Sequence, residues 1–482
     1  MKKKFLHFLI AIAIDLIISL LVPAANGLTE IGVRTLGAAA AVIYLWLFVG
    51  VDWTSLLAIV LFALAGTLPF STILANSAGS IPVLFIVTMS AISIALQESG
   101  VLNRLINWFI TRKLLRGRPW LFLGFFFAAV YIVSCFMDIA ACCLIALPIA
   151  KEVCREIGYQ DDDKFSIVMC LSVIWFGMWG YAATPISHTV AIIVMGLIEQ
   201  VTGVTVSVFD FMKVGIPGTL ALCVASFLVF RFILRPDVSK FVNYDPEARR
   251  SAAMPRKMSK AEKRTLTVFI LVVLAFLFPD LTAGILPSAS AFVGSLTIGT
   301  PAILGVAALV LIRADGKPLL DFNVAVKKIP WSAVMLVIGM FVMAPCLTAD
   351  STGIKVWIAN LLSPLTSGSA TWFALTFVVT AFCAISTNFM SCNAVANIVY
   401  SLVGPVALAL APTVNPIALG IVVAIAANIG IMTPAASAAS AVVLGNGVST
   451  VDGMRWGALM IPISIIICLL IVYPLALTVF PF

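Results

Sequence analysis

Residues 184–196, TPISHTVAIIVMG, and residues 433–445, TPAASAASAVVLG, are two versions of one phrase. Each begins with Thr-Pro, ends with Gly twelve positions later and carries small or hydroxyl side chains in between. The repetition of this phrase in two distant parts of one chain indicates an internal duplication.

The composition places both phrases in a membrane protein. Of the 482 residues, 62% are hydrophobic and only 10% are charged, whereas soluble proteins average about 25% charged residues. Stretches such as 212–234 and 456–480 are apolar enough to meet the requirement of roughly 20 residues for a bilayer span. We therefore expect an all-α polytopic protein whose partner is the lipid bilayer.

Further landmarks recur in the same order in the two halves. Ile81-Pro82 matches Ile329-Pro330, and FMDIAA at 136–141 matches FMSCNA at 389–394. The sequences ESG (98–100) and DSTG (350–353), and DFMKVG (210–215) and DGMRWG (452–457), are further pairs. The distance from Gly100 to Phe136 equals that from Gly353 to Phe389, 36 positions in each half. Shared order and spacing predict two homologous repeats.

The basic residues indicate how the repeats cross the bilayer. They gather at 2–4, at RKLLRGR (112–118) and in the loop 240–264, whereas Lys355 and Arg455 are the only basic residues after Asp350. Loops rich in Lys and Arg stay cytoplasmic, so the second repeat is predicted to be inverted and the N-terminus cytoplasmic, in an inner membrane. Inverted repeats are typical of secondary transporters, whose binding site lies where the two repeats meet.

Polar residues interrupt the apolar runs at matching places. One run is broken by Asp138 and ends at Pro148, and its counterpart is broken by a cluster of Ser, Thr and Asn between 386 and 397. Such breaks predict re-entrant hairpins near 134–150 and 386–405, because non-helical backbone at membrane depth must line a cavity or be buried in protein. An ionisable group such as Asp138 in the membrane is a functional hypothesis by default.

The Thr-Pro phrases predict broken helices near 177–196 and 428–445. Pro185 and Pro434 cannot donate a backbone hydrogen bond, and Gly177, Gly180 and Gly430 would add backbone freedom beside them. His188 is one of two histidines and is equally compatible with a proton carrier and with a hydrogen-bonded helix contact.

Other function classes fit less well. A channel needs a regular polar lining, and the chain has no HExxH, GxSxG or phosphate-cradling Gly-Lys-Ser/Thr motif of an enzyme. The basic loop has no interleaved aromatic platform, so no nucleic-acid partner is expected. A cation/proton antiporter using Asp138 remains the alternative transporter.

The chain resembles the divalent anion/sodium symporters, which include dicarboxylate, citrate and sulfate carriers. The similarity lies in LQESGVLNRLINWFITRKLLRGRPW, TGVTVSVFDFMKVGIPGTLAL and KKIPWSAVMLVIGM. It implies an elevator-type carrier, usually a homodimer, in which two Ser-Asn-Thr hairpin tips bind Na⁺ and substrate carboxylates. Here these tips read Asp138-Ile139-Ala140 and Ser391-Cys392-Asn393, so the member is divergent.

The resemblance and the residues together give our expectations for the organisation of the chain. We predict N-terminal scaffold helices in 1–78, a first repeat in 79–235, a basic cytoplasmic linker in 236–264, connecting scaffold helices in 265–328 and a second repeat in 329–482.

They also give our expectations for the site. We expect a small organic or inorganic anion as substrate, with di- and tricarboxylates as the expected class, moved by Na⁺ or H⁺ coupling or by exchange, with no other cofactor. Na⁺ is expected at Asp138 and Asn393. The predicted substrate contacts are Asn388, Ser391, Cys392, Asn393, Ser187, His188, Thr189, Ser437 and Ser440. The predicted ion-coupling positions are Asp138, Ile139, Ala140, Thr184, Thr387 and Thr433.

Overall fold

A computed structural model describes residues 2–186, 188–253, 257–362 and 371–482. Within these ranges, nine helices are long and apolar enough to cross a membrane, and a tenth span is possible if the bent pair α14 (Pro287–Ser295) and α15 (Gly299–Leu311) is counted as one. The strands described are the two-residue pair β1 (Arg313–Ala314) and β2 (Lys317–Pro318). The expected all-α membrane architecture is confirmed.

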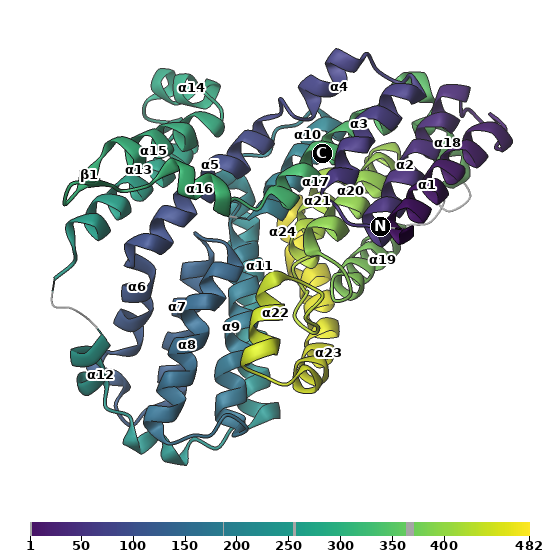
Figure 1. Cartoon of the computed structure of the whole chain (residues 1–482). Coiled ribbons are helices and arrows are strands. Elements are labelled where there is room, and N and C mark those ends of the chain that lie inside the picture. Colours follow the sequence, from purple (N-terminus) through teal and green to yellow (C-terminus); the bar gives the residue numbers. More distant parts are fainter. Residues whose placement is uncertain (1, 187, 254–256, 363–370) are drawn as a thin grey trace.

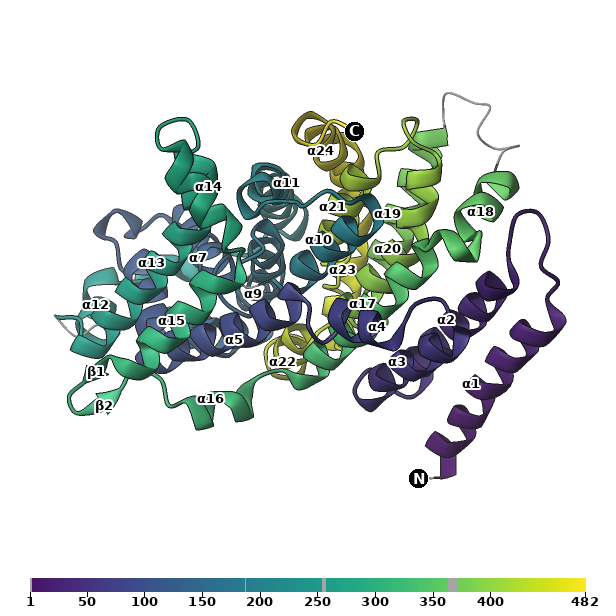
Figure 2. The same cartoon turned by 90° about the horizontal axis from the view of Figure 1, so that it is seen from above.

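The first four helices form one side of the molecule. Helix α1 (Lys2–Leu21) packs on α2 (Glu30–Phe48), which packs on α3 (Trp53–Ala65), and α4 (Phe70–Asn76) follows. The Trp46 indole N–H donates to Ser55 Oγ at 3.0 Å and joins α2 to α3. Helix α3 in turn packs on the long helix α17 (Trp331–Thr348). Figure 2 shows α1 on the opposite side of the molecule from α13 and α15.

Two series of helices follow each other with the same order of long, short and broken elements. The first comprises α5 (Ile81–Ser99), α6 (Val101–Ile110), α7 (Pro119–Ser134), α8 (Ile139–Ile157), α9 (Lys164–Ala183), α10 (Thr189–Thr202) and α11 (Val208–Leu228). The second comprises α17, α18 (Ile354–Leu362), α19 (Thr371–Ser386), α20 (Cys392–Ala409), α21 (Pro416–Ala426), α22 (Ala438–Asn446) and α23 (Thr450–Ile467). Helices α11 and α23 both continue into a π-helical turn, Val229–Leu234 and Cys468–Val472.

The two series exchange their short helices. Helix α10 of the first packs on α20 and α21 of the second, and α22 of the second packs on α8 and α9 of the first (Figure 1). The helices that follow the connections 135–138 and 387–391, α8 and α20, therefore each pack on a short helix from the other half of the chain. This exchange brings the two Thr-Pro phrases, 184–196 and 433–445, into one region.

The middle of the chain connects the two series. A short 3₁₀ helix (Ser239–Asn243) and α12 (Pro246–Ala253) lead to α13 (Lys260–Thr282), and α16 (Phe322–Lys328) precedes α17. The predicted linker 236–264 thus overlaps α13, because Ser259 and Glu262 form a capping box that begins the helix at Lys260. Arg256 lies outside the described residues. Helix α24 (Tyr473–Val479) ends the chain.

Two expectations about helix breaks were wrong. Pro148 lies inside α8 rather than at its end, since proline is tolerated in membrane helices where neighbouring groups satisfy the freed backbone. Gly177 and Gly180 lie inside α9. A Cβ at Gly180 would overlap the Tyr131 carbonyl oxygen, and one at Gly177 would overlap Ile139. These glycines therefore allow α7 and the start of α8 to approach α9 closely and do not loosen its backbone.

Candidate functional site

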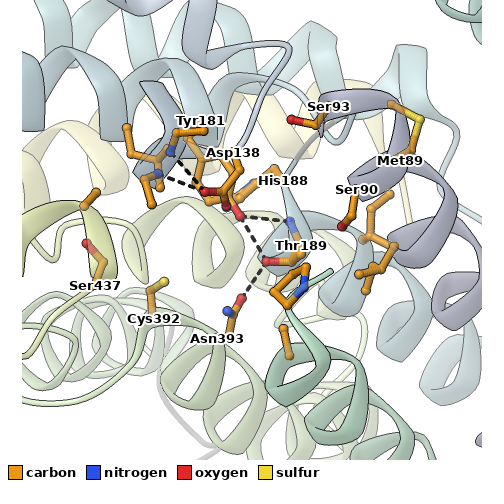
Figure 3. A pocket seen from close by; sticks show the side chains of 18 of the residues that line it. Met89, Ser90, Ser93, Asp138, Tyr181, His188, Thr189, Cys392, Asn393 and Ser437 are labelled. Carbon is orange, nitrogen blue, oxygen red and sulfur yellow. Dashed lines mark hydrogen bonds between the residues drawn. The ribbon is translucent and has the colours of Figure 1, made fainter. Parts of the chain in front are cut away.

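A cavity of about 530 Å³ lies where the two helix series meet. Its wall combines residues from both interrupted connections, from the α9–α10 break, from the start of α22 and from helices α5 and α17. Figure 3 shows Asp138 and Thr189 on one wall, and Cys392 and Asn393 approaching from the other half of the chain. A volume of this size is within the usual range of roughly 300–1,000 Å³ for small-molecule sites.

Asp138 lies at the start of α8, where it is the N-cap residue. Its Oδ1 accepts hydrogen bonds from the backbone N–H groups of Ala140 at 2.9 Å and Ala141 at 3.4 Å. The helix N-terminus carries a partial positive charge that favours a carboxylate. Asp138 therefore occupies the anion-binding position of its own helix, and it still lines the cavity with Ile139 and Ala140.

The equivalent helix in the second series begins differently. Ser391 is the N-cap of α20, and within the described chain its side chain makes no capping hydrogen bond. Ser391, Cys392 and Asn393 all line the cavity. Helix α22, by contrast, is capped by Ser437, whose Oγ accepts the Ser440 N–H at 3.0 Å. Helix α20 therefore begins without a side-chain cap, as does α10, whose N-cap residue His188 likewise makes no side-chain capping hydrogen bond in the described chain.

A hydrogen-bond chain connects the two halves across the cavity wall. The Tyr181 hydroxyl lies 3.0 Å from Thr189 Oγ1 and accepts the Thr189 N–H at 3.3 Å. Thr189 Oγ1 donates to Asn393 Oδ1 at 2.8 Å (Figure 3). Tyr181 was not predicted, because one tyrosine inside an apolar run carries no periodic or motif signal.

His188 is buried beside this chain. Its Nε2 lies 2.8 Å from Asn428 Nδ2, and its ring packs edge-on against Tyr181 with 4.3 Å between centroids. Within the described residues, neither His188 Nδ1 nor Asn428 Oδ1 has a hydrogen-bond partner. Unpaired polar atoms in a protein interior are costly, so these two atoms mark a place where a bound polar group would be stabilised. Asn428, a polar residue between apolar runs, was a signal that the sequence reasoning missed.

Other predicted site residues brace the second connection instead of lining the cavity. Asn388 donates to the Ala384 and Ile429 carbonyls at 2.7 and 3.0 Å, and its Oδ1 accepts the N–H groups of Ile431 and Met432 at 3.0 and 2.8 Å. The predicted substrate contact at Asn388 is therefore replaced by a structural role, since both polar atoms of its side chain are engaged by backbone. Predicted hydroxyl side chains also bond backbone carbonyls: Thr387 bonds Ala427 O, Thr433 bonds Asn388 O and Ser440 bonds Gly430 O in the second half, and Thr184 bonds Cys135 O in the first connection.

The structure thus divides the predicted residues into two groups. Those that line the cavity are Asp138, Ile139, Ala140, His188, Thr189, Ser391, Cys392, Asn393 and Ser437. Ser187 lies outside the described residues. Besides Tyr181 and Asn428, the sequence reasoning missed residues on the opposite wall: Ser90, Ser93 and Gln97 of α5, and Lys328 at the end of α16.

Comparison with known proteins identifies the family of this chain. A family model described as "Citrate transporter" matches residues 40–403. The chain belongs to the citrate transporter family. This membership confirms the resemblance stated from the sequence, and it makes the chain a multi-pass membrane transporter and not an enzyme.

Two relatives in sequence and one solved structure support the same assignment. The chain is 25% identical over 480 residues to the sodium-dependent dicarboxylate transporter SdcS of Staphylococcus saprophyticus, covering 95% of this chain and 88% of that protein. It is 25% identical over 368 residues to SdcS of Staphylococcus aureus, covering 73% and 68%. The crystal structure of the Alcanivorax borkumensis YdaH transporter aligns with a TM-score of 0.56 at 16% identity, covering 84% of this chain and 87% of that one. That likeness shows a shared fold.

Proposed function

We propose that this chain is a secondary active transporter of a small carboxylate anion, a di- or tricarboxylate, driven by Na⁺ or H⁺ or by anion exchange. The family match and the dicarboxylate transport named for the relatives support the substrate class. The observation that carries the proposal is the shared cavity, because each half of the chain contributes one interrupted connection and one short helix to its wall.

The uncapped start of α20 is the proposed position of a substrate carboxylate. Helix N-termini bind anions through free backbone N–H groups and the helix dipole. Asn393 and Thr189, already joined to each other at 2.8 Å, offer side-chain groups beside that terminus. A carboxylate at the start of α8 would instead meet the Asp138 carboxylate, and two such charges about 4 Å apart repel by roughly 4 kcal/mol at moderate effective dielectric.

Asp138 is the proposed coupling residue. Substrate and an ionised Asp138 in one cavity require a compensating cation, which a Na⁺ ion or a bound proton would supply. The same carboxylate is the observation that favours the alternative, a cation/proton antiporter. The two functions differ in their substrate. A carboxylate transporter binds an organic anion, whereas a cation/proton antiporter does not.

The same arrangement supports a proposal for the mode of movement. We propose that the hairpins α7–α8 and α19–α20 move with the broken helices against α1–α6 and α13–α18 as a fixed scaffold, in a homodimer in the inner membrane with a cytoplasmic N-terminus. The arrangement supports this division because α1 and α13–α15 flank the region that contains the cavity on opposite sides (Figure 2).

Uptake of labelled succinate and citrate into proteoliposomes tests the proposal, with Na⁺ and pH gradients varied separately. We expect uptake that depends on at least one gradient or on internal anion. Asp138→Asn keeps a good helix N-cap while removing the charge, so it should fold and lose gradient dependence. Normal coupling in Asp138→Asn would contradict the role of Asp138.

Cysteine protection separates the two transport classes. A single cysteine placed at Ser391 or Ser437, which both line the cavity, should be protected from a thiol reagent by succinate or citrate. Absence of any organic-anion effect, together with Na⁺/H⁺ exchange activity, would favour the antiporter.

A further inference from the structure

The cavity wall carries two charged side chains of opposite sign on opposite sides. Among the described residues that line it, Asp138 is the carboxylate and Lys328 is the one lysine or arginine. Lys328 ends α16, on the stretch that leads into α17, and its side chain is 53% exposed. It therefore belongs to the wall formed by α5, α16 and α17, away from the two interrupted connections.

Lys328 is held by a partner that an anion can displace. Its Nζ lies 2.6 Å from Glu98 Oε1, and the Glu98 side chain is 39% exposed. Ion pairs at such exposure contribute only about 0–1 kcal/mol. A ligand carrying two or three carboxylates can therefore replace Glu98 at small cost.

A polar stripe leads along α5 to this pair. Ser90, Ser93 and Gln97 line the cavity at helical spacing on one face, and the Gln97 amide donates to Ser93 Oγ at 3.3 Å. Figure 3 shows Ser90 and Ser93 across the cavity from Cys392 and Ser437. Glu98 directly follows Gln97, the last residue of the stripe, in the sequence, and Glu98 pairs with Lys328.

The repeat provides an internal comparison. When Ile81-Pro82 is aligned with Ile329-Pro330, Ser80 is the residue of the first repeat that corresponds to Lys328. The repeat unit itself therefore does not require a cation at this position. The neighbouring Lys327 shares the favourable position of a cation in the last turn of α16, yet Lys327 is not among the residues that line the cavity. The favourable electrostatics at the end of α16 therefore do not by themselves explain why Lys328 lines the cavity.

We propose that Lys328 is a substrate-recognising residue that binds a carboxylate group of the transported anion, and that Glu98 is a built-in competitor for it. The inference rests on the proposed carboxylate substrate. When the anion enters, it replaces Glu98 as the partner of Lys328, and Glu98 is released to solvent. The affinity for the anion then depends on how much more strongly Lys328 binds the substrate carboxylate than it binds Glu98.

Opposite effects of two substitutions test this inference. Binding of citrate and of succinate to the full-length protein in detergent is measured at low ionic strength and at about 0.5 M salt. We expect Lys328→Gln to weaken binding about three- to tenfold and Glu98→Gln to tighten it about two- to fivefold. Both differences should shrink at high salt, where the Debye length falls to a few ångström. The double variant should behave like Lys328→Gln, and Lys328→Arg should retain most of the affinity.

Lys327→Gln is the matched control, and its affinity should equal that of the wild type. If the Glu98–Lys328 pair is only structural, both single substitutions break it and shift affinity in the same direction, which overturns the inference. Unchanged affinity in Lys328→Gln also overturns it, while carboxylate binding by the wild type leaves the proposed function intact. A wild-type protein that binds and transports no carboxylate overturns both.

Discussion

Thr189 and Asn393 belong to different halves of the chain and form a 2.8 Å hydrogen bond, with Thr189 Oγ1 donating to Asn393 Oδ1. Thr189 begins α10 after the first break, and Asn393 lies in the first turn of α20 after the second connection. The bond therefore links the first Thr-Pro phrase, 184–196, to the start of α20 inside the cavity wall.

Thr189→Val removes the donor while keeping the volume of the side chain. We expect the affinity for the transported carboxylate to fall about tenfold, since loss of one hydrogen bond to a positioned polar group is worth roughly 1–1.5 kcal/mol. Thr202→Val on the same helix is the control, because the Thr202 hydroxyl donates to the Ile198 carbonyl and accepts the Val204 N–H and is not among the residues that line the cavity. A double-mutant cycle with Asn393→Ala should show coupling between the two sites, and additive effects would contradict the link.

Asn388→Ala should destabilise the protein rather than alter substrate affinity directly. The substitution leaves the Ile431 and Met432 N–H groups and two carbonyls without their side-chain partner. Each such buried group costs about 1–3 kcal/mol, so we expect a loss of roughly 3 kcal/mol or more, seen as a lower apparent melting temperature. Asn323→Ala on the exposed helix α16 should change stability by less than about 0.5 kcal/mol. Equal melting temperatures for the two variants would exclude the bracing role.

Gly180→Ala tests the close approach of α7 and α9. A methyl group at Gly180 would overlap the Tyr131 carbonyl oxygen and contact the Ser134 side chain, and such overpacking typically costs 1–3 kcal/mol. Gly124→Ala in α7 is the matched control, because a Cβ there meets no atom of the described chain within 4 Å. We expect lower thermal stability in the first variant and unchanged or higher stability in the second. Comparable stability of both would refute the packing argument.

Arg249→Ala tests how the linker helix α12 is fastened. The Arg249 side chain is 2% exposed and pairs with Glu152 at 3.0 Å and Glu156 at 2.5 Å, both on α8. Its removal should increase amide hydrogen exchange in α12 with little change in the helices around the cavity, because the two glutamates stay hydrated. Arg250→Ala, at an exposed position of the same helix, should leave exchange in α12 unchanged. Protection of α12 that survives in Arg249→Ala would show that other contacts hold it.

The sequence by itself determined the membrane class, the duplication and the positions of the interruptions. Apolar runs, paired Thr-Pro phrases and equal spacing are local properties of the chain, so they can be recognised without coordinates. The same patterns marked Asp138, Thr189 and Asn393, which all line the cavity, and the family resemblance was confirmed by the match over residues 40–403.

The tertiary structure decided what each polar residue does. Asn388 and Asn393 look alike in sequence, but Asn388 faces the backbone of the second break and Asn393 faces the cavity. That difference follows from how the connection before α20 packs against the break between α21 and α22, which no pattern in one segment reveals. The partners of His188 and Lys328, which are Asn428 and Glu98, likewise come from segments distant in the chain, so only tertiary packing could bring them together.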